Sequence, residues 1–519
     1  MNKLIQKFAL SVLLAGTAGI ASAQQYYSLD STYGNNGAAY LNSFYTYHDM
    51  SNPIDVTFQS DGKMICCYND MCHTFVMRLN PDGTLDNSFI PSSGYEVFPT
   101  PTAGVFQITG NVVGKNEAIV RQLANGKILM MLSGYGIFRI AANGTMDGAY
   151  DLTSNNPYRA LQYIQDFYES GSSQYYVGKV MPQNSNVDTI LLVKTNASGV
   201  RDNSYGIGGV KLITLDSAKF GYQNMVMKVS FTSDGKLLFT GRCQRAGYPG
   251  NGYDGFVAKY NVDGTPVNSF GNNGVTFLNF NNMNEYPHVM TTNTYGDIFV
   301  AGSADGKIFT TRLFANGTVD QSFGTNGEVL HTPDASCQGG NIFPYSIAAT
   351  SNSEVFVIGT YNPSVNVMYD EFISYNADGS PNTEFAPNGR IFNSNYERAN
   401  TLLTTPDNKI MAMAADTHAR IFRFKGAYDA LDVNDIQSVA EKIWTSEGKA
   451  FVQLPGTGVD ISAALLSVDG KLMRRYNATD FMSAGKDIKS VTLPADLPSG
   501  TYIFSVKNNL GTRQHKFIY

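Results

Sequence analysis

One segment recurs along most of this chain at intervals of 53 to 65 residues, and this repeat limits the available folds more than any other feature. Each copy has an apolar strand that ends in a basic residue, then a glycine turn, then usually an aspartate, and finally an aromatic residue. The turn glycines are Gly83, Gly144, Gly199, Gly264, Gly317 and Gly379. Repeats of this length indicate one supersecondary unit used many times, because a single unit cannot bury its own hydrophobic face.

The offsets around these glycines are nearly constant. The basic residue stands five positions before the glycine, at Arg78, Arg139, Lys194, Lys259 and Arg312, with Ser374 in the sixth copy. The aromatic residue stands six positions after it, at Phe89, Tyr150, Tyr205, Phe270, Phe323 and Phe385. Each copy also carries an earlier apolar run, such as 237–241 after Asp234 and Gly235. Short apolar runs bounded by glycine turns predict buried β-strands, and Asp-Gly pairs supply the positive φ of tight hairpins.

The two ends of the repeat region complement each other. A seventh copy has apolar strands at 410–415 and 420–424 but stops before any Asp-x-x-aromatic segment. That segment lies near the start of the chain, where Asp30 and Tyr33 are followed by the same Gly-x-x-Gly pattern. Sharing one blade between the two ends removes an exposed edge from a β-propeller. We therefore predict an all-β fold, a seven-bladed β-propeller closed by N- and C-terminal strands, with six or eight blades as alternatives.

The repeat resembles the delta-60 repeat family. The shared pattern is an Asp-Gly-Lys turn before an apolar strand, a strand ending in a basic residue, and Asp-Gly-Ser/Thr-x-Asp-x-x-Phe-Gly with a second glycine. The resemblance covers residues 28–426. It departs in the third copy, where Gly171-Ser-Ser-Gln replaces the Asp-Gly-Lys turn, and in the second, where no Gly-x-x-Gly follows Tyr150. The resemblance implies a propeller and no particular chemistry.

The first 23 residues have the three parts of a secretory signal peptide. Lys3 and Lys7 precede a mostly apolar run over 8–20, and small residues end at Ala23, before Gln24. The apolar run is shorter than the roughly 20 residues that cross a bilayer. We therefore expect cleavage between Ala23 and Gln24 and export of a mature chain without a transmembrane segment.

A different pattern follows the repeats. After a propeller at 24–426 and a linker at 427–433, residues 434–519 show six or seven short strands separated by turns. This pattern predicts a small antiparallel β-sandwich. An ordinary accessory domain is one interpretation of it.

The last segment also resembles the C-terminal (type A) sorting domain of proteins exported by the type IX secretion system of Bacteroidetes. The matching residues are Asp469, Gly470, Lys471, Leu497, Pro498, Gly500, Tyr502 and Lys516. The usual Tyr-Pro-Asn-Pro opening is absent, and Val433-Asn-Asp-Ile stands there. The resemblance implies a secreted or cell-surface protein that crosses the periplasm and outer membrane with the type IX machinery as its partner.

Charge and composition narrow the function classes. The chain has 37 lysines and arginines against 43 aspartates and glutamates, a formal net charge of −6. This balance argues against a nucleic-acid partner. Only 15% of residues are charged, and the 31 tyrosines, 31 phenylalanines and 50 glycines favour an all-β protein rich in turns.

The repeated basic residues have two interpretations. They could form a cationic ring for an anionic ligand, but aspartates follow them by eight positions in four copies, at Asp86, Asp147, Asp202 and Asp320. An ion pair inside each blade explains both residues. The repeated aromatics are expected to pack between blades, with a carbohydrate-stacking ring as the alternative. The turn from Asp82 to Asp86 offers too few oxygens for a dedicated calcium loop, so no cofactor is expected beyond incidental calcium.

Five cysteines remain after export, at Cys66, Cys67, Cys72, Cys243 and Cys337. A hairpin with Asn69 and Asp70 at its tip would place Cys67 opposite Cys72. Such a pair can form a cross-strand disulfide in an oxidising compartment, and free thiols are the alternative. His73 beside Cys72 would also suit zinc, but one Cys-x4-Cys-His indicates a metal site only weakly, and none is predicted.

No catalytic motif stands out, since the chain has no Gly-x-Ser-x-Gly, His-Glu-x-x-His, Walker loop or dinucleotide fingerprint. Propellers present loops on a rigid scaffold, and the loops at 181–188, 244–253 and 361–369 are the candidates here. The sequence favours a non-catalytic, exported propeller that binds a glycan, matrix component or protein partner through unidentified residues. The alternative is a polysaccharide hydrolase or lyase, which would need two or more acids or a histidine at one channel mouth.

Overall fold

The computed structural model describes residues 28–40, 52–69, 73–89, 105–109, 118–132, 136–145, 147, 163–180, 188–221, 223–244, 252–280, 283–332, 341–364, 367–393, 398–415, 419–425, 442–446, 448–453, 461–467, 471–485, 488–495, 497–508 and 511–519. The chain divides into two compact units, whose described parts lie within 28–425 and 442–519. In these parts β-strands dominate, and the named helical turns are α2 (Ser217–Phe220), η4 (Pro387–Gly389) and η6 (Ala478–Asp480). No helix among the described residues has the length and apolar character to cross a membrane.

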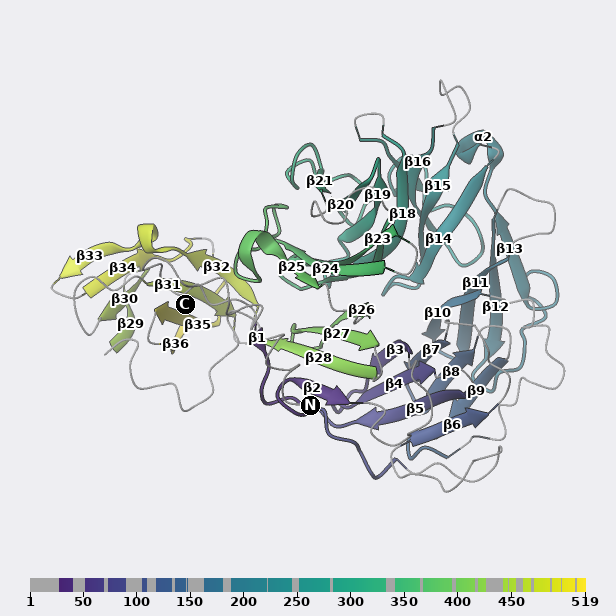
Figure 1. The fold of residues 1–519 in the computed structure, drawn as a ribbon, viewed down its shortest axis with the longest axis horizontal. Helices are drawn as coiled ribbons and strands as arrows, with labels where there is room; N and C mark the ends of the chain where they lie inside the picture. The colour runs from purple at the N-terminus through teal and green to yellow at the C-terminus, as the bar shows by residue number, and fades with distance from the viewer. Residues whose placement is uncertain are drawn as a thin grey trace. The chain divides into compact units, whose positions relative to one another are not determined.

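The described part of the first unit contains seven antiparallel sheets, which follow one another along the chain (Figure 1). Sheet 1 has β3 (Asn52–Phe58), β4 (Met64–Asn69), β5 (His73–Leu79) and β6 (Val105–Thr109). Sheet 2 has β7 (Ala118–Gln122), β8 (Ile128–Leu132) and β9 (Gly136–Ile140). Sheet 3 has β10 (Tyr163–Ser170), β11 (Ser173–Val180), β12 (Thr189–Asn196) and β13 (Val210–Thr214).

The next three sheets repeat the four-stranded plan. Sheet 4 has β14 (Asn224–Phe231), β15 (Leu237–Cys243), β16 (Asp254–Tyr260) and β17 (Val275–Leu278). Sheet 5 has β18 (Glu285–Thr292), β19 (Ile298–Ala304), β20 (Lys307–Leu313) and β21 (Glu328–His331). Sheet 6 has β22 (Asn341–Ala349), β23 (Val355–Ser364), β24 (Val367–Tyr375) and β25 (Arg390–Asn393). Consecutive four-stranded antiparallel sheets of this kind are the β-propeller architecture that the repeat predicts.

Sheet 7 combines strands from both ends of the first unit. It contains β26 (Arg398–Thr404), β27 (Ile410–Ala415) and β28 (Ala419–Lys425), with β1 (Ser28–Leu29) and β2 (Ala38–Tyr40) paired to β28. Leu29 lies opposite Phe424, and Ala38 lies opposite Phe422. The predicted pairing of the N-terminal segment with the last repeat is therefore confirmed. Contacts between first strands run from β3 through β7, β10, β14, β18 and β22 to β26, and β26 also contacts β3.

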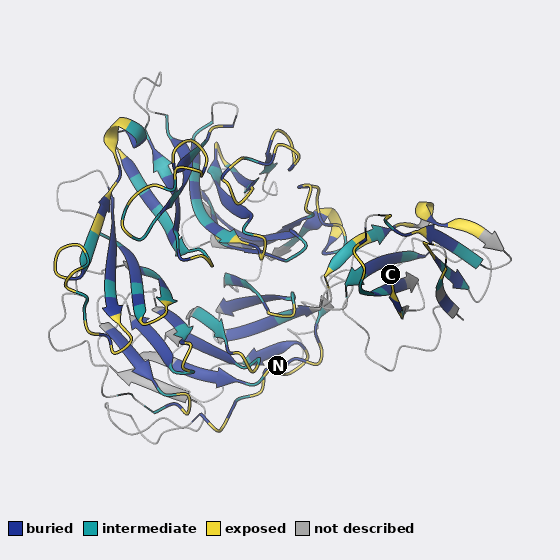
Figure 2. Ribbon diagram, turned by 180° about the vertical axis from the view of Figure 1, so that it is seen from behind, coloured by how far each residue is buried: buried dark blue, intermediate teal, exposed yellow. Residues whose placement is uncertain are grey.

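Apolar side chains form buried clusters between successive sheets. Exposed residues lie mainly in the turns (Figure 2). Between sheets 1 and 2, for example, Ile65 and Val76 pack with Val120 and Ile128 around the fully buried ring of Phe89. The apolar strand faces that pack in these clusters are thereby removed from water, which supplies the main driving force for folding.

The described part of the second unit has two four-stranded sheets. One has the order β29 (Lys442–Ser446), β30 (Lys449–Gln453), β34 (Ile488–Thr492), β33 (Met482–Gly485). The other has the order β32 (Leu472–Tyr476), β31 (Ser462–Ser467), β35 (Thr501–Asn508), β36 (Gly511–Ile518). Side chains of both sheets, including Val452, Leu465 and Phe504, share one buried core.

Candidate functional site

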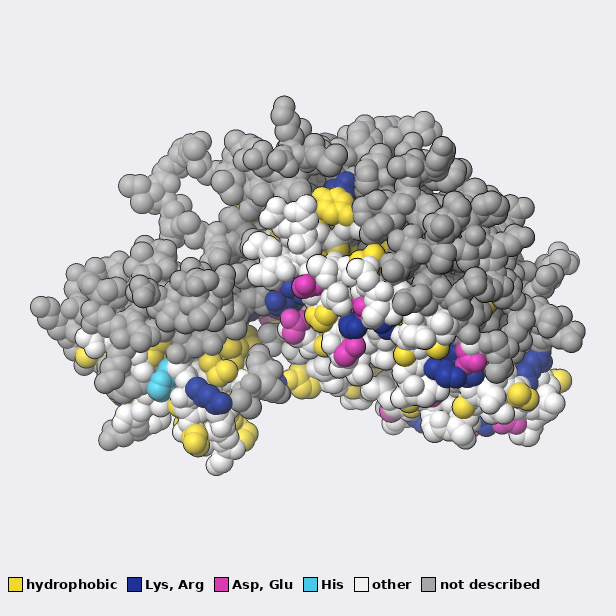
Figure 3. Space-filling model, turned by 90° about the horizontal axis from the view of Figure 1, so that it is seen from below, with side chains coloured by type: hydrophobic (Ala, Val, Ile, Leu, Met, Phe, Trp, Pro, Cys, Tyr) yellow, Lys and Arg dark blue, Asp and Glu magenta, His cyan; other side chains and the backbone are white. Residues whose placement is uncertain are grey.

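The repeated basic residues pair with aspartates of their own sheet, as the eight-residue offset predicts. The nitrogen–oxygen distances are 2.6 Å for Arg78–Asp86, 2.7 Å for Arg139–Asp147, 2.7 Å for Lys194–Asp202 and 3.4 Å for Arg312–Asp320. Figure 3 shows basic and acidic side chains beside one another on one face of the molecule. Because these cations already have anionic partners, a cationic ring for a ligand is not supported at these positions.

The same ion pair joins the two ends of the repeat region. Arg423 of β28 lies 2.8 Å from a carboxylate oxygen of Asp30, and its guanidinium lies 4.5 Å from the centre of the Tyr33 ring. Burial by itself raises the pKa of Asp30, but hydrogen bonds from Thr32 and the charge of Arg423 outweigh it and lower the pKa to about 2. Asp30 is therefore ionised across the physiological pH range.

Two further sets of contacts around these pairs do not follow from the repeat pattern alone. Lysines of the preceding turns reach the same aspartates, at 2.8 Å for Lys63–Asp86, 2.6 Å for Lys127–Asp147 and 3.2 Å for Lys409–Asp30. Arginines also donate to a backbone carbonyl of the next sheet, at 2.6 Å for Arg139–Ala197, 3.1 Å for Arg312–Ala377 and 2.9 Å for Arg423–Pro81. The repeated cations thus connect neighbouring sheets, which is a structural role.

The repeated aromatics pack against the glycine turn of the following sheet, as predicted. A Cβ atom on Gly83, where φ is +82°, would lie 2.8 Å from the Tyr33 ring. A Cβ atom on Gly317 would lie 2.9 Å from the Phe270 ring. These rings are therefore not available for stacking on a carbohydrate. Tyr150 lies outside the described residues.

The hairpin that contains Cys67 has a different register from the predicted one. Asn69 lies opposite Thr74, and Cys67 lies opposite Val76, because the turn between β4 and β5 is longer than two residues. The predicted facing of Cys67 and Cys72 is therefore wrong, and Cys72 itself lies outside the described residues. Cys67 is a free thiol with no exposed surface, and burial raises its pKa. Cys66 is also a free, buried thiol, Cys243 is buried, and Cys337 lies outside the described residues.

The candidate loops are described only at their ends. Asp188 accepts a hydrogen bond from the Val226 amide at 2.9 Å, and Tyr361 donates to Glu371 at 2.8 Å inside sheet 6. Tyr253 donates to the side chain of Gln223 at 2.9 Å. The first two contacts are buried and structural, so only the loop that ends at Tyr253 presents a described polar aromatic near the surface.

The aspartate at the start of the turn considered for calcium forms hydrogen bonds within that turn. The Asp82 carboxylate accepts hydrogen bonds from the Thr84 amide and hydroxyl at 2.9 and 2.6 Å. These bonds lower the pKa of Asp82. In the described parts of the chain no three histidine, cysteine, aspartate or glutamate side chains gather to hold a metal ion.

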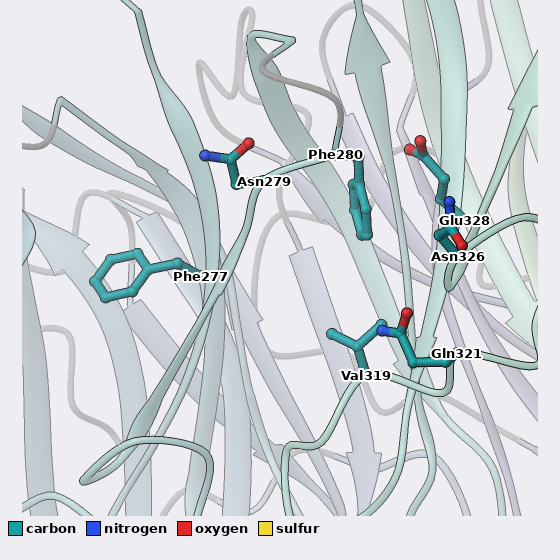
Figure 4. A pocket seen from close by; sticks show the side chains of 7 residues that line it. All are labelled: Phe277, Asn279, Phe280, Val319, Gln321, Asn326 and Glu328. Carbon is teal, nitrogen blue, oxygen red and sulfur yellow. The ribbon is translucent and has the colours of Figure 1, made fainter.

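A pocket of 360 Å³ lies between sheets 4 and 5 (Figure 4). Its lining residues are Phe277, Asn279, Phe280, Val319, Gln321, Asn326 and Glu328. Figure 4 shows Val319 and Gln321 below Phe280, with Asn326 and Glu328 on the side away from Phe277. The lining surface is mainly polar, whereas most small-molecule sites are mainly apolar, and the volume lies within the usual range for such sites.

Local structure fixes both walls of this pocket. On one wall Phe277 belongs to β17, and the Phe280 amide donates a hydrogen bond to Glu285 at 2.8 Å. On the other wall Asn326 has φ of 55°, which turns the chain so that Glu328 begins β21 opposite Thr311. The amide side chains of the lining can both donate and accept hydrogen bonds, and the carboxylate can accept them. The lining therefore offers suitable partners for hydroxyl groups.

Glu285 lies next to this pocket but does not line it. Its side chain is fully buried, and burial raises its pKa to about 8, with Asp254 and Glu328 adding to the effect. The carboxyl is therefore mostly neutral at pH 7. Glu328 is the one acid among the described residues of the lining, whereas glycoside hydrolysis usually uses two carboxyl groups.

The sorting-motif segments meet in the second unit. The segment that ends at Lys471 follows β31, the one from Leu497 to Tyr502 enters β35, and Lys516 lies in β36, so the three contribute to adjacent strands. Gly500 and the terminal Tyr519 exchange backbone hydrogen bonds of 3.1 and 2.9 Å. The Tyr502 hydroxyl donates to the Pro498 carbonyl at 2.7 Å. Asp469 and Gly470, and Ala23 and Gln24 of the expected cleavage site, lie outside the described residues.

Comparison with known proteins supports the fold. A family described as "Domain of unknown function (DUF5122) beta-propeller" matches residues 72–89. No curated protein matches the chain in sequence.

Solved structures resemble the chain at low identity. A catalytically inactive virginiamycin B lyase from Staphylococcus aureus with quinupristin is 11% identical over 74% of this chain and 98% of that one, with a TM-score of 0.39. A glucose dehydrogenase is 10% identical over 59% and 94%, with a TM-score of 0.32. PorZ, an essential surface component of the type IX secretion system of Porphyromonas gingivalis, is 10% identical over 90% and 81%, with a TM-score of 0.20. None of these values transfers an activity to this chain.

The sequence did not predict the pocket residues, and the reason can be identified. Gln321 and Glu328 occupy ordinary repeat positions, on either side of the Gly-x-x-Gly turn. Phe280 lies beyond the repeat pattern, in the connection between β17 and β18. Only the packing of sheet 4 against sheet 5 brings these residues together, and no local motif records it.

Proposed function

We propose that this chain is an exported, non-catalytic β-propeller that binds a glycan at the cell surface or in the medium. In this proposal the first unit is a seven-bladed ring closed by its N- and C-terminal strands. The pairing of β28 with β1 and β2, and the Arg423–Asp30 ion pair, support closure. The second unit is a small antiparallel β-sandwich, supported by the core that its two sheets share.

The observation that carries glycan binding is the lining of the pocket between sheets 4 and 5. It combines Phe277 with the amides of Asn279, Gln321 and Asn326 and the carboxylate of Glu328. Amide and carboxylate groups can satisfy the hydroxyls of a sugar, while ring faces cover its C–H surface. The pocket volume of 360 Å³ lies within the usual range for small-molecule sites, so a sugar unit is a ligand of suitable size.

A glycan array probed with the mature chain, followed by calorimetry, tests this function. Gln321→Ala should weaken binding of the selected glycan at least tenfold, because its amide hydrogen bonds are lost. Asn87→Ala is the matched control, since Asn87 occupies the same repeat position in sheet 1 and is exposed. Equal binding by the Gln321→Ala variant and wild type would contradict the assignment. Release of reducing sugar from any bound polysaccharide would instead favour the hydrolase or lyase.

Delivery by type IX secretion is part of the same proposal. It rests on the sorting-domain resemblance and on the adjacency of β31, β35 and β36, which the three motif segments follow, enter and occupy in turn. Deleting residues 434–519 should trap the propeller in the periplasm of the native host, as fractionation would measure. Normal secretion of the shortened chain would show that the segment is an accessory domain.

A further inference from the structure

Arg242 differs from six other arginines of the first unit in the groups that it contacts. Six of them, Arg78, Arg121, Arg139, Arg312, Arg390 and Arg423, form ion pairs with aspartate or glutamate. Among the described residues Arg242 has no carboxylate within ion-pair distance. Its contacts are aromatic instead: the guanidinium carbon lies 4.9 Å from the centre of the Tyr253 ring and 4.7 Å from that of Tyr286.

The register of sheet 4 explains why Arg242 lacks an acidic partner. Arg242 lies opposite Gly255 in the pairing of β15 with β16, and Asp254 lies opposite Cys243. Successive residues of a strand point to opposite faces, so Asp254 and Arg242 are directed to different sides of the sheet. Gly255 also permits close approach to sheet 5, because a Cβ atom there would lie 2.8 Å from Pro287.

Hydrogen bonds hold Tyr253 in place, and its ring lies next to that of Tyr286. The Tyr253 amide donates to Asn284 at 2.9 Å, and its hydroxyl donates to Gln223 at the same distance. The centres of the Tyr253 and Tyr286 rings are 5.8 Å apart. Rings that cover the face of a guanidinium leave its in-plane N–H groups free to donate, and that planar fork matches the geometry of an oxyanion.

His288 adds no positive charge to the surroundings of Arg242. It lies on β18 two residues after Tyr286, and its Nε2 is 3.1 Å from the Ser303 hydroxyl. Burial, together with the positive charge of Arg242, lowers the pKa of His288 to about 4. The histidine is therefore neutral at pH 7, and Arg242 is the charge that a ligand would meet.

We propose that Arg242, Tyr253 and Tyr286 form an anion-recognition site for an acidic sugar. In this site the Arg242 guanidinium donates to an oxyanion carried on a pyranose ring, and the tyrosine rings contact the sugar. The oxyanion is a uronate carboxylate or a sulfate ester, which present the same chemistry to a guanidinium. The site shares no residue with the pocket that carries the proposed function, so either proposal can fail alone.

Binding of three polymers to the full mature chain tests the site. Polygalacturonate, dextran sulfate and neutral dextran are titrated by calorimetry at low and at moderate salt. We expect binding of at least one anionic polymer, weakened by salt, and at least tenfold weaker binding of dextran. Arg242→Gln should reduce the anionic affinity at least tenfold, and Arg242→Lys should restore only part of it, because lysine lacks the planar fork.

Lys307→Gln is the matched control, since it removes one positive charge from sheet 5 without touching the tyrosines. Its affinity should stay within twofold of wild type. Undiminished anionic binding by Arg242→Gln, or equal binding of dextran, would overturn the proposal. If Arg242→Gln fails to fold, phenylglyoxal labelling of wild type replaces it. Labelling of Arg242 should slow at least fivefold with the binding polymer, and unchanged labelling would also overturn the proposal.

Discussion

The two edges of the sheets in the first unit hold their charges in opposite ways. At the edge with the repeated glycine turns, Arg78 contacts the ionised carboxylate of Asp86. At the edge where β15 ends and β18 begins, Arg242 contacts aromatic rings, and Glu285 is held mostly neutral. A guanidinium that joins two sheets already donates its N–H groups to protein acceptors. A guanidinium that contacts only aromatic rings keeps its N–H groups available for a ligand. Charge alone therefore does not identify a binding edge.

From this contrast we expect the largest change in the free energy of unfolding at Asp86. Asp86→Ala leaves Arg78, whose side chain is 9% exposed, without a carboxylate in a buried site. Loss of one partner of a buried pair costs about 3–5 kcal/mol, so the free energy of unfolding in urea should fall by that amount. A double change, Arg78→Met with Asp86→Leu, should recover part of the loss. Stability equal to that of Asn87→Ala would contradict the structural role of the pair.

We expect the next largest effect on the free energy of unfolding at Glu285, and this effect depends on pH. Its folded pKa of about 8 lies above the unfolded value of 4.5, so the folded chain keeps a proton that the unfolded chain releases between these values. The contribution of Glu285 to the free energy of unfolding of the wild type should therefore be highest below pH 4.5. It should fall as pH rises towards 8, by at most about 1.4 kcal/mol per pH unit.

Glu285→Gln should remove this slope, because the amide does not ionise. Its melting temperature should exceed that of wild type increasingly from pH 5.5 to pH 8. Thermal unfolding over that range measures the difference. Parallel curves for the two proteins would show that Glu285 is ionised in the folded state.

Gly83 and Gly126 provide a smaller, matched test of packing at the repeated turns. Both have positive φ, but a Cβ on Gly83 would meet the Tyr33 ring, and one on Gly126 would meet nothing within 4 Å. Gly126→Ala should cost about 1–2 kcal/mol from backbone strain alone. Gly83→Ala should cost at least about 1 kcal/mol more, because the ring must move. Equal losses in urea unfolding would mean that the turn is not packed on Tyr33.

The smallest effect on stability is expected at Arg242. Arg242→Gln breaks no ion pair among the described residues and removes only contacts with two rings. Its unfolding free energy should change by less than about 1 kcal/mol, in contrast to Asp86→Ala. Urea unfolding checks this value, and a loss of 3 kcal/mol or more would place Arg242 among the structural arginines.

Local spacing made much of the fold predictable from the sequence. A tight glycine turn brings residues eight apart side by side, so the Arg78–Asp86 pair follows from their offset. The truncated last repeat predicts that the segment around Asp30 joins the last strands, and in the structure Asp30 lies beside Arg423. The Cys67 register was missed because hairpin length depends on the turn between β4 and β5, where no Asp-Gly pair fixes it. The Arg242 site and the pocket depend on contacts between sheets, which spacing along one repeat does not encode.

The position of Asp30 also affects the order in which the chain can fold. Asp30 and Arg423 are separated by 393 residues, whereas the contacts of Arg139 and Arg312 with the next sheet span 58 and 65 residues. Closing the longer loop costs about 2 kcal/mol more in chain entropy, since this cost grows with the logarithm of length. The N-terminal segment can pair with β28 only once the residues near 423 have been synthesised. A chain that ends before β28 would therefore leave β1 and β2 without their partner strand.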